Sequence, residues 1–237
     1  YSYNYTPNGN LKSEGIVVPG LSGTSTTSYS YDTQQNLKDI THPDNSKTLY
    51  AYSFRNLPTQ IQYQATSTPT SIVNSVSYNE LGLAATTTYA NGVNIINTYD
   101  SNKLLRLSNK LSQKAGSTTT LQNISYVYDN VGNILNLKDI SNSSTTKNVT
   151  YTYDDLYRLT NAIATTSSST LYNTSYSYNI LGNLLTRGPI SYTYSNAGLL
   201  NPNAPSQVGS STLSYDNNGN LTNDGVHKNT WSYKNEL

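Results

Sequence analysis

Two histidines are the first residues of this chain to consider for catalysis or metal binding, because imidazole titrates near neutral pH and is a common metal ligand. His42 and His227 each lie in a turn-like stretch and are far apart in the sequence. A catalytic or metal-binding pair would require the fold to bring them together. We interpret both as exposed polar residues, so the sequence predicts no catalytic residue and no metal site.

Acidic residues offer two further candidates. The oxygen-rich stretch Asp216-Asn217-Asn218-Gly219-Asn220 suggests a calcium loop, but the EF-hand pattern needs Gly at its sixth position and Glu at its twelfth, where this chain has Leu221 and His227. Asp154-Asp155 is a paired acid, yet neighbours on a strand point to opposite faces and cannot share a substrate proton. We expect turn formation at both places.

Other residues and motifs that are typical of catalytic sites are absent from the sequence. The chain has no Cys, which excludes disulfides, thiolate metal sites and a cysteine nucleophile. It also has no glycine-rich phosphate loop and no nucleophile elbow. The sequence therefore predicts a protein that is not an enzyme and has no cofactor.

Composition points to a β protein with polar turns. Of the 237 residues 35% are hydrophobic and 11% charged, against roughly 45–50% and about 25% in typical globular proteins. The 23 Tyr residues are strand formers that disordered chains lack. A balance of 14 basic and 13 acidic residues argues against nucleic-acid binding. No apolar run approaches the roughly 18 residues that would indicate membrane insertion.

A repeat organises the whole sequence. After the second Tyr of a Tyr-x-Tyr pair, Gly or Asn tends to follow four residues later and Leu or Ile six residues later. Eleven copies, the last aligned on Tyr233, give a mean period of about 23 residues, within the range of solenoid-like arrays. The residues that define the repeat are Tyr5, Gly9, Leu11, Tyr31, Asp32, Tyr78, Gly82, Tyr99, Asp100, Tyr128, Asp129, Gly132, Tyr153, Asp154, Tyr178, Gly182, Tyr194, Gly198, Tyr215, Asp216 and Gly219.

Each copy predicts a strand, a tight turn and a second strand. Large and small residues alternate in stretches such as 149–153, so the tyrosines should line one face. The Asp or Asn after the tyrosine bonds its own backbone two residues on, and Gly accepts positive φ. A second turn, as at 43–46 and 90–92, returns the chain to the next Tyr-x-Tyr. We predict an all-β fold of tandem β-hairpins forming a spiralling sheet, solenoid-like or a partial shell, with essentially no helix.

Four Ser/Thr/Asn-rich stretches interrupt this pattern, at 22–27, 67–71, 165–169 and 203–207. The repeat resumes in phase on both sides of each, so we interpret them as long hairpin loops and predict one domain over residues 1–237. The chain has no Met and no targeting signal, so we expect it to be a fragment of a larger protein.

The motif Tyr215-Asp216-Asn217-Asn218-Gly219-Asn220-Leu221 resembles the YD repeat of bacterial Rhs and wall-associated proteins, which is related to repeats of insecticidal toxin complexes and teneurins. The resemblance implies a β-hairpin ribbon that spirals into a hollow shell, often around a toxic C-terminal cargo, in secreted or surface-displayed proteins. This chain departs from the family in the glycine position of at least four copies, and the family's arginine survives mainly as Arg158. It also lacks the family's self-cleaving segment and toxin module.

Three functions follow as hypotheses. The first is a non-catalytic scaffold of an extracellular or cell-surface protein, whose partners are flanking domains or cargo of a larger polypeptide. The second is an extracellular fibre or adhesin that self-associates through open sheet edges. The third is a carbohydrate-binding module in which rings such as Tyr128 and Tyr178 stack on sugars, although tyrosines packing on one another across strands is the simpler interpretation.

Overall fold

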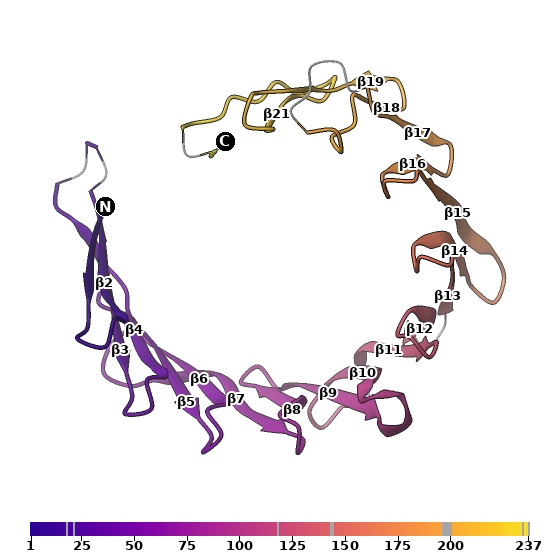
Figure 1. Cartoon of the computed structure of the whole chain (residues 1–237). Coiled ribbons are helices and arrows are strands. Elements are labelled where there is room, and N and C mark those ends of the chain that lie inside the picture. Colours follow the sequence, from indigo (N-terminus) through magenta and orange to yellow (C-terminus); the bar gives the residue numbers. More distant parts are fainter. Residues whose placement is uncertain are drawn as a thin grey trace. The chain divides into compact units, whose positions relative to one another are not determined.

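The computed structural model describes residues 1–17, 19–20, 22–117, 119–142, 145–195, 201–233 and 235–236. Within these residues the regular structure is antiparallel β, apart from one short 3-10 turn, η1 (Ser101–Lys103). Figure 1 shows the strands following one another along the chain. The predicted all-β fold is confirmed. No helix among the described residues is long and apolar enough to cross a membrane.

The chain separates into two compact units. Unit 1 comprises Tyr1–Ser125 and Asp139–Ser144, and unit 2 comprises Tyr126–Lys138 and Thr145–Leu237. The division runs through strands β11 (Thr120–Tyr128) and β12 (Ile134–Asn142). The repeat continues on both sides of this division. The single array over residues 1–237 stays a prediction.

Unit 1 is a meander in which each strand pairs antiparallel with the next along the chain. Two strands per period, joined by alternating turns, account for this order, as the sequence predicted. Its strands are β1 (Ser2–Tyr5), β2 (Leu11–Ile16), β3 (Ser25–Tyr31), β4 (Leu37–Thr41), β5 (Lys47–Tyr52), β6 (Pro58–Gln64), β7 (Thr70–Tyr78), β8 (Ala84–Tyr89), β9 (Val93–Asp100) and β10 (Arg106–Lys114).

Unit 2 repeats the same meander and its strands become shorter toward the end of the chain. After β19 the last pair, β20 and β21, forms a separate two-stranded sheet. The strands are β13 (Thr145–Tyr153), β14 (Leu159–Thr165), β15 (Thr170–Tyr178), β16 (Leu184–Arg187), β17 (Ile190–Thr193), β18 (Gln207–Val208), β19 (Ser211–Thr212), β20 (Ser214–Tyr215) and β21 (Leu221–Asn223).

The interrupting polar stretches are shorter as loops than predicted. Residues 25–27 belong to β3, where Thr26 pairs with Gly15, and residues 70–71 belong to β7. Thr165 ends β14 and pairs with Thr170 across the turn. Threonine has a high strand propensity because its branched side chain suits a pleated surface. Polar composition alone therefore overestimated these loops.

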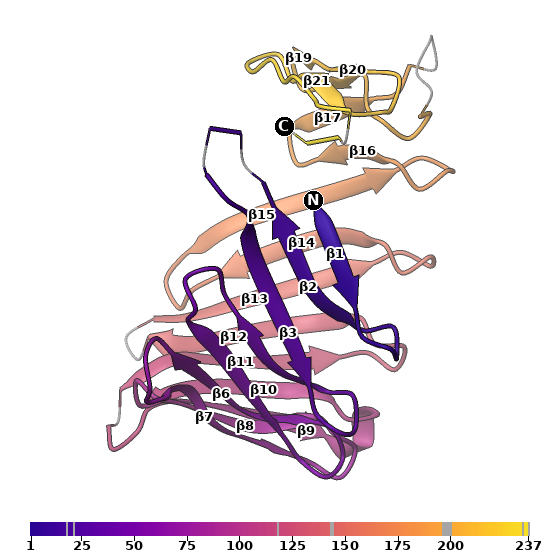
Figure 2. The same cartoon turned by 90° about the vertical axis from the view of Figure 1, so that its left-hand side faces the viewer.

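Very little of the molecule is buried. The buried hydrophobic side chains among the described residues are only Val73, Val149, Ala162 and Ala164. Figure 2 shows the strands of unit 1 lying side by side in one layer. Because the described residues bury so few hydrophobic side chains, the hydrophobic contribution to stability is small for a chain of this length. Hydrogen bonds between and within the hairpins must therefore supply much of what holds the sheet together.

Candidate functional site: a repeated aromatic turn

One turn geometry recurs where a strand ends on an aromatic residue, which we designate position n. The next strand begins at n+6, and these two residues pair across a β-bulge, as Tyr31 does with Leu37 and Tyr153 with Leu159. The extra residue of a bulge increases the local twist and redirects the strand. The same n/n+6 pairing closes the hairpins at Tyr5, Tyr52, Tyr78, Tyr178 and Tyr215.

Two backbone hydrogen bonds close this aromatic turn. The amide of n+1 donates to the carbonyl of n+5, and the amide of n+4 donates to the carbonyl of n+1. In the Tyr31 turn these are Asp32 N to Asn36 O, 2.9 Å, and Gln35 N to Asp32 O, 3.1 Å. The same two bonds recur in the turns whose n+1 residues are Thr6, Ser53, Asn79, Asp154, Asn179, Asp216 and Ser232.

The side chain at n+1 bonds the turn's own backbone. Asp32 Oδ1 accepts from the amides of Gln34 and Asn36 at 2.8 and 2.9 Å, and its Oδ2 accepts from the Asn36 side chain at 3.0 Å. Asn79 accepts from Leu81 and Leu83 in the same way. The Asn36 side chain first, together with these amides, lowers the pKa of Asp32 below its ordinary value. In their ionised form, these carboxylates therefore stabilise the turns by accepting hydrogen bonds from the backbone.

In the turns with the n/n+6 pairing, position n+4 keeps a left-handed backbone whether or not it is glycine. Gly82 and Gly182 have φ of 81° and 87°, whereas Gln35, Asn56 and Tyr157 at the same position have φ of 67°, 59° and 61°. Gly9, Gly132 and Gly219 also have positive φ. The copies with Gln35, Asn56 or Tyr157 in the glycine position thus keep the turn geometry. A non-glycine residue tolerates this conformation only at a cost in strain.

The tyrosine hydroxyl connects each repeat to the preceding one. Tyr31 Oη donates to Leu11 O at 2.8 Å, and Tyr178 Oη donates to Leu159 O at 2.9 Å. The acceptor is the carbonyl of position n+6 of the preceding repeat, and we call this contact the tyrosine latch. It recurs in the pairs Tyr52–Leu37, Tyr78–Pro58, Tyr99–Ala84, Tyr153–Ile134 and Tyr194–Leu184.

The sequence prediction did not include the latch, although the composition contained a signal for it. The chain has 23 Tyr and one Phe, a ratio that ring packing alone would not require, since phenylalanine packs equally well. Stacked tyrosines are two residues apart in the sequence, as Tyr1 with Tyr3 and Tyr126 with Tyr128. The hydroxyl, in contrast, makes the contact between repeats.

Partial burial affects the latch tyrosines. It raises the pKa of Tyr52, Tyr178 and Tyr194 above the ordinary value of 10.0. A raised pKa keeps the phenol protonated, and only the protonated phenol can donate to a carbonyl. The latch is therefore fully formed at neutral pH.

Two turns differ from the predicted frame. The closing copy is centred on Trp231, because Asn235 has φ of 58° and Trp231 Nε1 donates to Leu221 O at 2.9 Å, whereas Tyr233 is 90% exposed. The indole N–H thus replaces a tyrosine hydroxyl. Aligning on the second aromatic residue was wrong here, since the turn follows the first.

The turn after Tyr99 is longer than predicted. Tyr99 pairs with Leu107 instead of the n+6 residue, and η1 occupies the turn. Leu104 and Leu105 both have positive φ, while the predicted n+4 residue, Lys103, does not. Asp100 still accepts from Asn102 N at 2.8 Å. Asp100 therefore keeps its role in the turn, but the distance along the chain from Tyr99 to its paired residue is longer than in the other copies.

The remaining predicted repeat residues take comparable places, apart from Gly198, which lies outside the described residues. Tyr215 Oη donates to Pro205 O at 3.0 Å. Leu11 pairs with Tyr5 as described above, and Tyr128 ends β11 in the predicted position. Asp129 accepts from the amides of residues 131, 132 and 133.

Arg158 contacts two consecutive repeats. Its Nε donates to Asp154 Oδ2 in its own turn at 2.7 Å, and its Nη1 donates to Asn179 O in the following turn at 3.1 Å. Its guanidinium carbon lies 4.8 Å from the centre of the Tyr178 ring, within the range of a cation–π contact. One side chain thereby joins two turns and a latch tyrosine.

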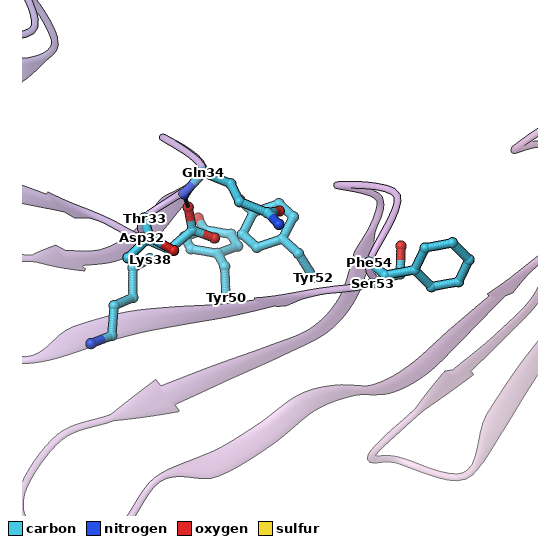
Figure 3. Close-up of a pocket in the computed structure, with 8 residues that line it drawn as sticks. All are labelled: Asp32, Thr33, Gln34, Lys38, Tyr50, Tyr52, Ser53 and Phe54. Carbon is cyan, nitrogen blue, oxygen red and sulfur yellow. Dashed lines mark hydrogen bonds between the residues drawn. The ribbon is translucent and has the colours of Figure 1, made fainter.

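Shallow pockets lie between consecutive aromatic turns. Figure 3 shows one with a volume of about 410 Å³, between the turns that follow Tyr31 and Tyr52. Tyr50 and Tyr52 contribute rings, and the Tyr52 hydroxyl is already engaged by Leu37 O at 2.9 Å. Sugar binding by such rings remains a prediction. The lining residues are Asp32, Thr33, Gln34, Lys38, Tyr50, Tyr52, Ser53 and Phe54.

The two histidines have separate local partners. His42 Nε2 lies 2.9 Å from Thr48 Oγ1 in unit 1, and His227 Nδ1 lies 3.1 Å from Asp224 Oδ2 in unit 2. Asp154 and Asp155 lie in the turn after β13, where the sequence predicts a turn, so strand alternation does not apply to them. Across the described part of the chain, no group of three or more His, Cys, Asp or Glu side chains could hold a metal ion.

No family model and no curated protein matches this sequence. Among solved structures the chain is similar to the TcdB2-TccC3-TEV complex, with a TM-score of 0.71 and 17% identity over 92% of this chain. It is also similar to TcdB2-TccC3-Cdc42, with a TM-score of 0.72 and 17% identity over 92% of this chain. Each likeness spans 14% of the matched chain.

A third similar structure is a mutant Tc holotoxin pore from Photorhabdus luminescens, with a TM-score of 0.62 and 16% identity over 90% of this chain and 13% of that one. At these identities the likeness shows the fold. A sheet of tandem antiparallel hairpins is therefore an architecture that this chain shares with parts of Tc toxin structures.

Proposed function

We propose that this chain is a non-catalytic structural scaffold, a section of a β-sheet wall in an extracellular or cell-surface protein of the Rhs/YD-repeat type. The observation that carries the proposal is the aromatic turn with its tyrosine latch, which recurs through both units. Its carboxylates bond backbone amides and its hydroxyls bond carbonyls, so the repeated polar groups serve the fold.

The partners proposed for this wall are flanking domains or cargo of a larger polypeptide. The similar chains in Tc toxin structures are about seven times as long as the matched segment, since it covers 14% of each. A one-layer sheet also leaves both faces available for a neighbour, because the described chain buries so few hydrophobic side chains. We propose that the wall encloses or displays another module and does not bind nucleic acid or insert into a membrane.

Protease protection tests the enclosing role. The chain would be expressed with the sequence that its gene encodes on either side, and digested under native conditions. We expect the flanking module to be cut much more slowly when attached to the wall than when expressed alone. Equal rates of cleavage in both forms would contradict enclosure, and binding of the module outside the wall would then be measured by cross-linking.

A second candidate function is self-association, and the exposed turn tips favour it. Ile180 and Phe54, both at position n+2 of an aromatic turn, are 98% and 90% exposed. Leu81 and Leu156 at n+3 are also exposed. Exposed apolar residues at repeated intervals can mark an interaction surface. Electron microscopy over a concentration series separates the candidates: filaments support the fibre, and discrete particles at every concentration support the wall.

A further inference from the structure

Two side-chain positions of the aromatic turn, n+4 and n+5, contact each other between consecutive repeats. Asn36, at n+5 of the Tyr31 turn, donates from Nδ2 to Oδ1 of Asn56, at n+4 of the Tyr52 turn, at 3.0 Å. The acceptor is a residue that stands where the repeat pattern has glycine. The donor precedes it by one whole repeat.

The same pairing is found at two other places. Asn10 Nδ2 donates to Gln35 Oε1 at 2.7 Å, and Asn220 Nδ2 donates to Asn235 Oδ1 at 2.8 Å. In each case the donor is at n+5 of one turn and the acceptor is at n+4 of the next. The acceptors Gln35 and Asn235, like Asn56, have positive φ.

Glycine at n+4 goes with a different donor in the preceding repeat. Gly82 follows a turn that contains Arg55, whose Nη1 donates to Asn79 O at 3.4 Å. Gly182 follows the turn that contains Arg158, whose Nη1 donates to Asn179 O at 3.1 Å. The arginine thus bonds the backbone at n+1 of the next turn. A Cβ added at Gly82 would lie 3.9 Å from Arg55 Nη2, so a longer side chain there would compete with the arginine for space.

The cost of a left-handed backbone makes this pairing informative. An ordinary side chain loses stability in that conformation, and Gln has no local advantage there. An amide at n+4 can recover part of that loss through the hydrogen bond that it accepts from the previous repeat. Tyr157 is an n+4 residue that carries no amide and has no such bond. The local bond of the n+5 asparagine does not explain this, because Asn133 donates to Asp129 Oδ2 at 2.8 Å just as Asn36 and Asn220 donate to the aspartates of their own turns.

We propose that the n+5 side chain of one repeat and the n+4 side chain of the next form a recognition pair that determines which repeats are compatible as neighbours. An asparagine at n+5 selects an amide at n+4, and an arginine in the preceding turn selects glycine. This goes beyond the scaffold function, which needs only that the hairpins pair. It accounts for the amides that replace glycine in the copies with Gln35, Asn56 and Asn235.

A double-mutant cycle on the whole chain tests the pair in unit 1. The variants are Asn36→Ala, Asn56→Gly and the combination, each compared by urea unfolding. We expect Asn56→Gly to raise the unfolding midpoint more in the Asn36→Ala background than in the original chain, because the original loses a hydrogen bond along with the strain. The cycle of Asn133→Ala with Tyr157→Gly is the matched control and should be additive. Additive shifts in both cycles would overturn the proposal.

A transplanted pair tests the same proposal in unit 2 by gain of interaction. Gly182→Asn should lower the unfolding midpoint alone, since no atom crowds a Cβ there and only backbone strain is added. Combined with Arg158→Asn it should lower the midpoint by less than the sum of the two single changes, because the two introduced asparagines would recreate the amide pair. A combined loss equal to or larger than that sum would contradict the recognition pair.

Discussion

Each latch tyrosine combines a strand-forming ring with a donor placed at a repeat boundary. The Tyr178 hydroxyl reaches Leu159 O at 2.9 Å while its ring lies beneath Arg158. Phenylalanine would keep the ring contact and leave that carbonyl without its donor. Removing only the hydroxyl, by a change from tyrosine to phenylalanine, therefore measures the latch separately from the packing of the ring.

Tyr178→Phe should lower the free energy of unfolding by about 0.5–1.5 kcal/mol, the usual net contribution of one intramolecular hydrogen bond. Urea unfolding monitored by circular dichroism measures the change. Tyr176→Phe is the matched control, since Tyr176 lies on the same face of β15 and its hydroxyl has no hydrogen bond among the described residues. An equal loss in both variants would show that the latch contributes nothing specific.

The turn carboxylates predict sensitivity to acid. Amide hydrogen bonds from His227 and Val226 lower the pKa of Asp224 from 3.8 to about 2. The amide of Arg158 first, and then its guanidinium, lower the pKa of Asp154. A lowered pKa in the folded state stabilises the fold above the unfolded value of 3.8 and loses that effect as pH falls toward the folded value. Urea midpoints should therefore fall between pH 4 and about 2, and Asp224→Asn should reduce the dependence.

The latch tyrosines predict sensitivity to alkali with the opposite sign. Burial raises the pKa of Tyr52, Tyr178 and Tyr194 above 10.0. Their contribution is therefore complete below the unfolded value and is lost as pH rises through the folded values. Tyrosinate absorbance and circular dichroism should change together above pH 10.0. Ionisation of all tyrosines with no loss of β signal would contradict the latch.

The hairpin is the element whose geometry the aromatic turn determines. In the copies of regular length, position n+4 must be left-handed for the bulge at n and n+6 to close. Gly182→Ala should lower the free energy of unfolding by roughly 1–2 kcal/mol from strain alone, since no atom lies within 4 Å of the added Cβ. Leu181→Ala, one residue earlier and exposed, should have little effect. Equal midpoints for the two variants would argue against a strained turn.

The sequence predicted the hairpins well because their information is local. Tyr-x-Tyr alternation and an Asp or Asn followed by Gly specify a strand and a turn within ten residues. The predicted alignment of the last copy on Tyr233 and the predicted length of the turn after Tyr99 were wrong. Trp231 can take the place of the tyrosine in the last copy, and a few additional residues still close the hairpin after Tyr99. The latch joins residues that are 10 to 20 positions apart, such as Tyr194 with Leu184 and Tyr31 with Leu11, and no local pattern specifies such a contact.

On the scale of the whole chain, each unit is a meander whose repeats contact mainly their neighbours. Stability in such arrays is close to a sum of repeat stabilities and of the interfaces between adjacent repeats. In this chain the interfaces are ladder hydrogen bonds, latches and the Arg158 contact, because the described residues bury few hydrophobic side chains. A rigid wall must therefore be held together by polar contacts distributed along its length.

Native-state hydrogen exchange, resolved residue by residue by NMR, tests this central claim most directly. If the chain is a wall of latched hairpins, slowly exchanging amides should recur in successive strands of both units, including those of β5 and β14, and the aromatic turns should keep their n+1 and n+4 amides protected. Uniformly fast exchange, or protection confined to one short stretch, would show that the chain does not form a rigid scaffold.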